Sequence, residues 1–177
     1  MNHISIDLET LGTTAGHVIL SIGARRFDPI TGETFDSFYA NLDRLEQESL
    51  GMSVNPATEQ WWFEQSPEAQ ERLLVDVESP YEGLMRFVHW CGNVDGAWGW
   101  GSNFDIVLIE SLFDLYAAKT PWRYWNIRCG RTICALVDIK PARLEGHHQA
   151  DMDATVQAEA IIAAYKKLGL CKQGDLF

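Results

Sequence analysis

Three strand-like runs joined by short connections open the chain and end at Leu42. Apolar and polar residues alternate from Ile4 to Leu8, and two longer runs extend over residues 18–27 and 34–42. Between the longer runs, the segment Asp28-Pro29-Ile30-Thr31-Gly32-Glu33 has the composition of a turn. Because short connections join antiparallel neighbours, this region is predicted to form an antiparallel three-strand meander.

Helical patterns and short strand-like segments follow the meander. A capping residue precedes a proline, as is typical of helix starts, at Asn55-Pro56, Ser66-Pro67 and Ser79-Pro80. Further on, the sequence predicts a strand over 97–101, a helix over 103–118, an irregular segment with a short strand over 121–131, and a last helix over 150–168. The expected fold is α/β, with a mixed sheet (the meander plus parallel strands) flanked by helices, in a single domain over residues 1–177.

The composition argues against several classes of protein. A net charge of -11 is unsuited to coating long nucleic acid, although it allows an enzyme that holds a few terminal nucleotides. The chain has no apolar run of about 18 residues and no signal-peptide pattern at its start, so no membrane association and a cytoplasmic location are expected. Its four cysteines form no C-x-x-C pair, which favours reduced thiols over a zinc or redox site.

Positive charge is concentrated in one part of this acidic chain. Residues 119–143 contain a single acid, Asp138, and six basic residues: Lys119, Arg123, Arg128, Arg131, Lys140 and Arg143. Any one of them is explained by a solvated surface, but the cluster as a whole indicates a side that faces phosphate.

Two acids share one face of the first predicted strand. Asp7 and Glu9 are two residues apart, so their side chains project to the same side, whereas Ile4, Ile6 and Leu8 take the other. A lone D-x-E is common at protein surfaces, so this pair gains meaning only from acids elsewhere in the chain.

Two further acids occupy positions where an apolar residue would be expected. Asp105 begins the apolar stripe of its predicted helix, although an exposed acid in the first helical turn is the alternative explanation. Asp153 precedes Ala160 and Ala164 by seven and eleven residues, which places it on the inward face of the last helix. Asp151 lies about 200° around that helix and is expected to be solvated.

Four inward carboxylates cannot converge without neutralisation. Burying an ionised carboxylate without a partner is costly, and like charges raise each other's pKa. Oxygen ligands suit Mg²⁺ or Mn²⁺ rather than zinc. Two divalent ions would balance four carboxylates, as in sites where a pair of ions holds the attacking and leaving oxygens of a phosphodiester.

A histidine motif completes the pattern. His148 stands five residues before Asp153, in the run His148-Gln149-Ala150-Asp151-Met152-Asp153-Ala154. Together with Ile6-Asp7-Leu8-Glu9-Thr10 and Asn103-Phe104-Asp105, in this order, the run resembles the DnaQ-like, or DEDDh, 3'→5' exonuclease family over nearly the whole chain. Because His147 is adjacent, the choice of His148 depends on its spacing to Asp153.

The resemblance implies a ribonuclease H-like fold and a set of roles. Asp7, Glu9, Asp105 and Asp153 are the implied ligands of two Mg²⁺ or Mn²⁺ ions, and His148 is the implied general base. The implied reaction releases nucleoside 5'-monophosphates from a single-stranded nucleic-acid 3' end, and the implied assembly is a homodimer. Within this family, the chain is most similar to a small exoribonuclease-like branch found in bacteria and phages. The segments that carry this closer resemblance are Glu59-Gln60-Trp61-Trp62, Trp125-Asn126-Ile127-Arg128 and Arg131-Thr132-Ile133.

Substrate contacts are predicted from residue chemistry. Trp61 and Trp62 are adjacent on a predicted helix and point about 100° apart, so both cannot face one core. Either one of them stacks on a base of the substrate, or one packs inward while the other fills a subunit contact. Further candidates for contact with the terminal nucleotide, its sugar or its phosphates are Leu11, Gly12, Asn103 and Arg131. Trp122 and Trp125 lie within the basic stretch, so either could also be near the substrate.

Two other functions fit the same pattern. One is a phosphodiesterase of dinucleotides or short oligonucleotides with the same metal site. The other is a non-catalytic nucleic-acid-binding scaffold, which would have no reason to keep inward acids that cost stability. The choice between RNA and DNA stays open, because no group that reads the 2'-hydroxyl is identifiable.

Overall fold

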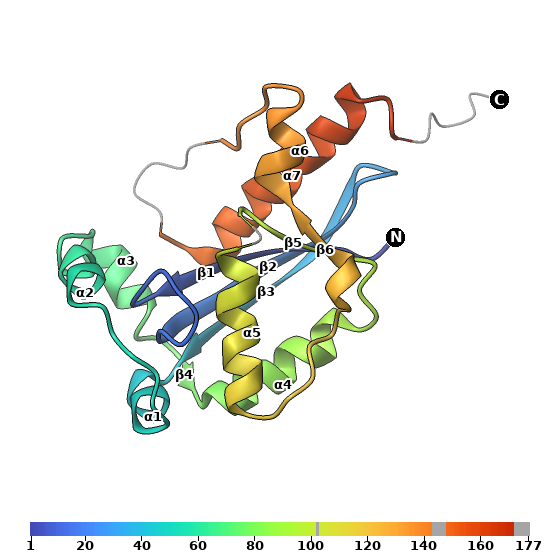
Figure 1. The fold of residues 1–177 in the computed structure, drawn as a ribbon. Helices are drawn as coiled ribbons and strands as arrows, with labels where there is room; N and C mark the ends of the chain where they lie inside the picture. The colour runs from blue at the N-terminus through green and yellow to red at the C-terminus, as the bar shows by residue number, and fades with distance from the viewer. Residues whose placement is uncertain (102, 143–147, 172–177) are drawn as a thin grey trace.

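The structure is a computed structural model, and it describes residues 1–101, 103–142 and 148–171 (Figure 1). Its six-stranded sheet has the order β4-β3-β2-β1-β5-β6. The strands are β1 (His3–Thr10), β2 (Ile19–Asp28), β3 (Glu33–Leu42), β4 (Val77–Glu78), β5 (Gly96–Gly99) and β6 (Ile127–Cys129). The helices are α1 (Arg44–Ser49), α2 (Pro56–Phe63), α3 (Pro67–Arg72), α4 (Pro80–Cys91), α5 (Asp105–Leu115), η1 (Tyr124–Asn126), α6 (Gly130–Ala135) and α7 (Ala150–Lys167).

The strand directions confirm the predicted mixed sheet. β1, β2 and β3 form an antiparallel meander, in which Asp7 pairs with Gly23 and Gly23 with Tyr39. β5 lies parallel to β1, and β6 lies parallel to β5. The carboxyl ends of β1, β5 and β6 therefore meet at the same edge of the sheet, which is where functional side chains gather in sheets of this kind.

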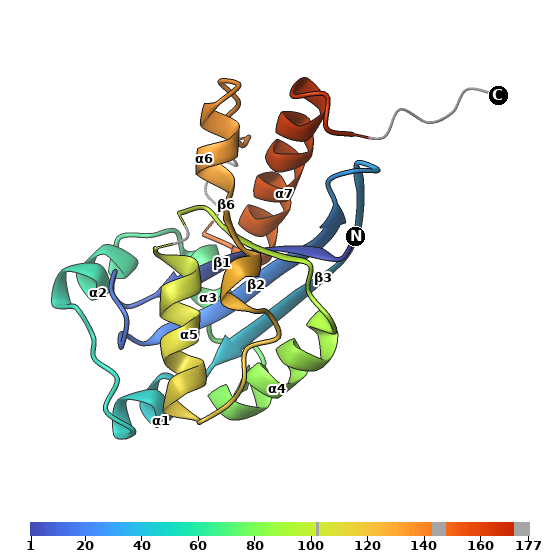
Figure 2. The same ribbon diagram turned by 45° about the vertical axis from the view of Figure 1, so that its right-hand side comes forward.

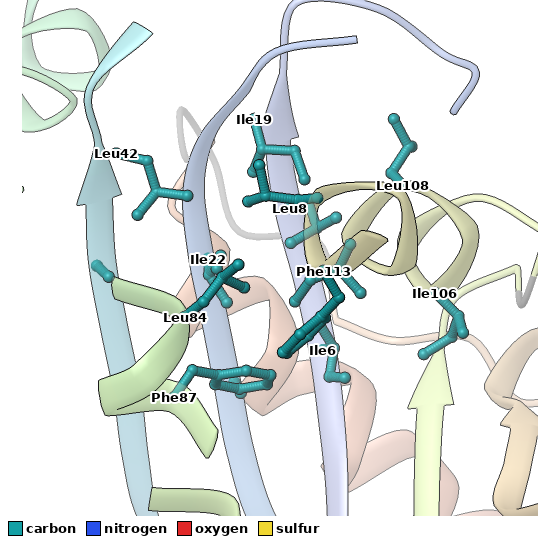
Figure 3. Packing of buried hydrophobic residues seen from close by; sticks show 14 of the residues in the cluster. Ile6, Leu8, Ile19, Ile22, Leu42, Leu84, Phe87, Ile106, Leu108 and Phe113 are labelled. Atoms are coloured by element: carbon teal, nitrogen blue, oxygen red, sulfur yellow. The ribbon is translucent and has the colours of Figure 1, made fainter. Parts of the chain in front are cut away.

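Helices cover both faces of the sheet. α4 and α5 lie on one face, and α6 and α7 lie on the other (Figures 1 and 2). The apolar side of β1 faces α4 and α5, where Ile6 and Leu8 pack with Phe87 and Phe113 in the larger core (Figure 3). A smaller core beneath α6 and α7 includes Phe27, Trp98, Cys134 and Ile161. The polar side of β1 consequently faces α7, as the alternation of its residues predicts.

The start of α7 lies directly on the middle of the sheet. Gly23 has no side chain, and a methyl group there would lie 2.0 Å from the carbonyl carbon of Ala150. Since Gly23 is the pairing partner of Asp7, this close approach brings the first turn of α7 over that part of β1. Within the described residues, no helix is long and apolar enough to cross a membrane.

A Gly23→Ala variant is expected to lose about 1–3 kcal/mol of unfolding free energy, because its methyl group overlaps the backbone of α7. Urea denaturation measures the loss. Gly51→Ala is a backbone control, since space around Gly51 is open, although its φ of 98° adds a local strain of its own. An unfolding free energy for Gly23→Ala equal to that of the wild type would show that the helix does not approach the strand so closely.

Candidate active site

Three carboxylates converge where α7 crosses β1. One oxygen each of Asp7, Glu9 and Asp153 lies within 4.8 Å of the other two. Asp7 and Glu9 come from the polar side of β1, and Asp153 comes from the first turn of α7. The structure thus brings together three of the four predicted ligands, from segments more than 140 residues apart.

The fourth carboxylate reaches the same edge of the sheet from the opposite layer. Asp105 begins α5 and is 3% exposed, which excludes the alternative of an exposed first-turn acid. Its Oδ2 atom accepts a hydrogen bond of 3.0 Å from the backbone N–H of Trp100, just after β5 ends. The backbone of Leu8, on β1, also lowers the pKa of the Asp105 carboxyl group. The charge of Asp105 acts on both Asp7 and Glu9.

Burial and mutual repulsion change the acidity of this group. Burial, and then the charges of Asp105, Glu9 and Asp153, raise the pKa of Asp7 well above its usual value. Burial, followed by the charges of Asp153 and Asp105, raises the pKa of Glu9 to about 8. The acids therefore resist joint ionisation near neutral pH unless cations compensate their charge.

Burial also affects the pKa of Asp105, but neighbouring groups compensate more of its effect. Burial raises its pKa to about 7, opposed by backbone hydrogen bonds and by the positive charge of Arg131. A cluster with oxygen donors only, and with raised pKa values, fits Mg²⁺ or Mn²⁺ in its donor chemistry. Bound cations would restore the ionised forms that the protein alone disfavours.

Gln157, which was not predicted as a site residue, holds the Asp7 carboxylate in place. Its Nε2 atom donates a 2.7 Å hydrogen bond to Asp7 Oδ1, while its Oε1 atom accepts from Ser5 at 3.4 Å. Gln157 is 6% exposed and lies one turn after Asp153 on α7. The sequence feature that could have identified Gln157 is the presence of a glutamine among the inward alanines of this helix.

The candidate base lies against the helix that carries the two tryptophans. The ring of His148 meets Trp61 edge-on with 4.6 Å between centroids, and meets Trp62 at 5.8 Å. Trp62 is buried, and its indole N–H donates to the carbonyl of Thr10 at 3.0 Å. Trp61 is 39% exposed. His147, the alternative base, lies outside the described residues.

A cleft of about 430 Å³ opens beside the carboxylates. It is lined by Leu8, Glu9, Thr10, Thr13, Ala57, Thr58, Trp61, Trp62 and Phe104. Glu9 belongs to both the carboxylate group and this cleft, and Trp61, Trp62 and Phe104 are the large aromatic residues in the lining of the cleft. The cleft therefore has one acidic end and an aromatic interior, a combination that suits a nucleotide.

The other predicted substrate contacts lie in different surroundings. Leu11 is 2% exposed and packs in the larger core, away from the lining of the cleft. Gly12 is buried, and its carbonyl accepts a bond from the Thr10 hydroxyl. Asn103 is exposed just before α5, and exposed Arg131 lies close enough to Asp105 for its charge to affect that acid. Contact of these residues with substrate stays a prediction.

Asp151 is not solvated in the way its helical position predicts. Its Oδ1 atom forms an ion pair of 2.7 Å with Arg72 of α3. Arg72 also bonds to the side chain of Gln149 and stacks over the ring of Tyr39 at 4.4 Å. Since Gln149 and Asp151 flank the start of α7 directly after His148, Arg72 fastens this segment to the rest of the protein.

An Arg72→Ala variant is expected to lower kcat about 10- to 100-fold with a smaller change in KM, because the segment that carries His148 and Asp153, the predicted base and a predicted metal ligand, loses this anchor. Steady-state kinetics on the single-stranded nucleic acid that the sequence resemblance implies as the substrate measures the change. Arg86→Ala is a matched control, since Arg86 likewise bonds a carboxylate, Glu78, and lies over an aromatic ring, Phe38. An equal loss in both variants would refute a positioning role for Arg72.

The fold and the match to a family model define the class: a DnaQ-like 3'→5' exonuclease built on the ribonuclease H-like fold. The predicted resemblance is thereby confirmed. Within that class, the chain belongs to the family of 3'-5' exoribonuclease Rv2179c-like domains, whose family model matches residues 2–165.

Individual proteins resemble this chain in sequence or in fold. An exodeoxyribonuclease of Enterobacteria phage T4 is 26% identical over 155 residues, covering 72% of this chain and 68% of the relative. The magnesium- and manganese-bound structure of Pop2p from S. pombe has a TM-score of 0.62 at 14% identity, covering 95% of this chain and 84% of Pop2p. The nuclease domain of 3'hExo, a DEDDh family member bound to rAMP, has a TM-score of 0.62 at 11% identity, covering 97% of this chain and 94% of that domain.

Proposed function

We propose that this 3'→5' exonuclease depends on divalent metal and releases nucleoside 5'-monophosphates from single-stranded 3' ends. The observation that carries the proposal is the convergence of Asp7, Glu9 and Asp153 oxygens within 4.8 Å, with buried Asp105 beside them. Four acids in one place cost stability unless they bind cations. A scaffold protein would gain nothing from them, so the cluster supports catalysis.

The same four carboxylates, Asp7, Glu9, Asp105 and Asp153, would hold two Mg²⁺ or Mn²⁺ ions. When bound, these ions supply charge neutralisation, a more acidic attacking water and stabilisation of the leaving 3' oxygen. The Pop2p structure, bound to magnesium and manganese, lends support to this assignment from a protein of the same fold.

The protein's own side chains would orient the terminal nucleotide and move a proton. His148 lies next to the substrate cleft through its contact with Trp61, and an imidazole can accept and donate a proton. We assign it the role of general base that accepts the proton of the attacking water. Trp61 and Phe104 offer aromatic surface to the terminal base, and Gln157 keeps Asp7 oriented.

RNA and DNA are both reasonable substrates. The family model is described as an exoribonuclease, whereas the phage relative is an exodeoxyribonuclease. We favour RNA because the family model covers residues 2–165 of the chain. From the resemblance, we also propose a single domain over residues 1–177 and a homodimer, which light scattering after gel filtration would test.

The deciding experiment digests 5'-labelled single-stranded RNA and DNA of one sequence with Mg²⁺, with Mn²⁺ and with EDTA. The proposal expects a ladder that shortens from the 3' end by one nucleotide at a time, and no products with EDTA. A 3'-phosphate-blocked strand serves as the control for direction. Internal cleavage, or undiminished cleavage in EDTA, would refute the proposed mechanism.

A further inference from the structure

Two neighbouring aromatic side chains are exposed at the β6 edge of the sheet. Tyr124 is 80% exposed and Trp125 is 54% exposed, and both lie on η1 directly before β6. Their rings meet edge-on with 4.8 Å between centroids. The guanidinium of Arg123 lies 5.2 Å from the centre of the Trp125 ring. Arg123, Tyr124 and Trp125 are called the aromatic platform below.

The aromatic platform is held in position from several sides. The carbonyl of Trp125 accepts a 2.6 Å hydrogen bond from Arg128, and Asn126 donates to the carbonyl of Val94 at 2.8 Å. One residue later, β6 begins and pairs with β5, with Ile127 opposite Ala97. Large rings on an anchored backbone lose little conformational freedom when a flat partner stacks on them.

Charge indicates the kind of partner that the aromatic platform fits. The whole chain carries -11, yet residues 119–143 hold six basic residues and one acid. In the described part of that segment, Lys119, Arg123, Arg131 and Lys140 are exposed. Exposed rings together with arginines match the faces of nucleobases and the phosphates between them.

The position of the aromatic platform relative to the carboxylates is fixed by the sheet. β1, β5 and β6 are parallel, and the platform precedes the amino end of β6, whereas the carboxylates lie at the carboxyl ends of β1 and β5. Arg131, just past the carboxyl end of β6, acts on Asp105. Arg131 on α6 and Trp125 on η1 are six residues apart, and six residues span less than ~20 Å even when fully extended at ~3.3 Å each. A strand of ~6 stacked nucleotides at ~3.4 Å each covers that length.

We propose that the aromatic platform binds single-stranded nucleic acid upstream of the 3' end that occupies the carboxylate site. This inference rests on the proposed function and adds a second contact to it. A strand that leaves the site past Arg131 would follow the β6 edge, pass Arg128 and stack its bases on Tyr124 and Trp125. Substrates too short to reach the platform would be bound by the cleft alone.

The test compares a Tyr124→Ala/Trp125→Ala double variant with the wild type on a trinucleotide and on a 20-nucleotide RNA. The expected result is a KM about tenfold higher for the 20-mer, corresponding to the loss of about one stacked base. Both kcat and the kinetics on the trinucleotide should be unchanged. Tyr81→Ala is the matched control, because Tyr81 is an aromatic that is 49% exposed on α4.

A second variant and a binding measurement distinguish a failure of this inference from a failure of the proposed function. Arg123→Ala should weaken binding of a fluorescent 20-mer and reduce its salt dependence, because one phosphate contact is lost. Fluorescence anisotropy measures this on protein carrying Asp7→Asn, so the readout does not require cleavage. An unchanged KM on the 20-mer, an equal loss on the trinucleotide, or an altered oligomeric state with unchanged length dependence would each overturn the inference.

Discussion

An Asp7→Asn variant is expected to cleave single-stranded RNA on the order of 10³-fold or more slowly than the wild type, because residues that act as one catalytic unit fail together. Asp7 is bonded to Gln157 and lies within 4.8 Å of Glu9 and Asp153 at a carboxylate oxygen. Asparagine has the same shape but no charge, so the fold is preserved while metal affinity falls. Single-turnover cleavage in saturating Mg²⁺ measures the loss of the chemical step.

The same variant should be as stable as the wild type, or more stable, when metal is absent. The substitution removes one buried ionisable group from a cluster whose members raise each other's pKa. Thermal unfolding in EDTA, with circular dichroism to confirm the fold, provides this comparison. Asp36→Asn is the control, since Asp36 is an exposed acid on β3 that pairs with Arg26. Full activity of Asp7→Asn would eliminate the assigned site.

Elements with strong local signals were predictable from the sequence. The meander follows from alternating residues and a short turn, and α2, α3 and α4 begin at the predicted prolines. The short elements α1, β4 and α6 were not predicted. Helices of six residues and a strand of two residues are too short to be stable alone, so tertiary contacts determine them.

The acids of the site were predictable for a different reason. Folding alone would favour other residues at the positions of Asp7, Glu9, Asp105 and Asp153. This mismatch between residue type and position can be recognised from the sequence alone. The residues that pair with Asp151 and with Asp7 are not unusual for their positions. Arg72 meets Asp151 across 79 positions, and Gln157 reaches Asp7 across 150. Only the packing of α3 and α7 against the sheet brings these pairs together, which is why the prediction of a solvated Asp151 was wrong.

Metal-free protein is expected to lose on the order of 3 kcal/mol of unfolding free energy as pH rises from 6.5 to 8.5. In the folded state the pKa of Glu9 is about 8 and that of Asp105 about 7, while that of Asp7 is also raised. Carboxyl groups of the unfolded chain titrate near pH 4. Between pH 6.5 and 8.5, these carboxyl groups therefore still hold protons only in the folded state. Stability therefore falls as pH rises, since the folded state binds more protons than the unfolded state.

The range from pH 6.5 to 8.5 excludes the pH values at which a histidine has the opposite effect on stability. Burial lowers the pKa of His3 to about 4, so protonation of unfolded histidine makes stability rise with pH below about 6.5 and has little effect above it. Urea denaturation at each pH in EDTA gives the free energies, and repeating the series with Mg²⁺ should abolish or reverse the slope, because metal binding requires deprotonated ligands. A Glu9→Gln variant should flatten the metal-free slope. A wild-type stability that is constant or rises across this window in EDTA would show that the carboxylates do not share a buried site.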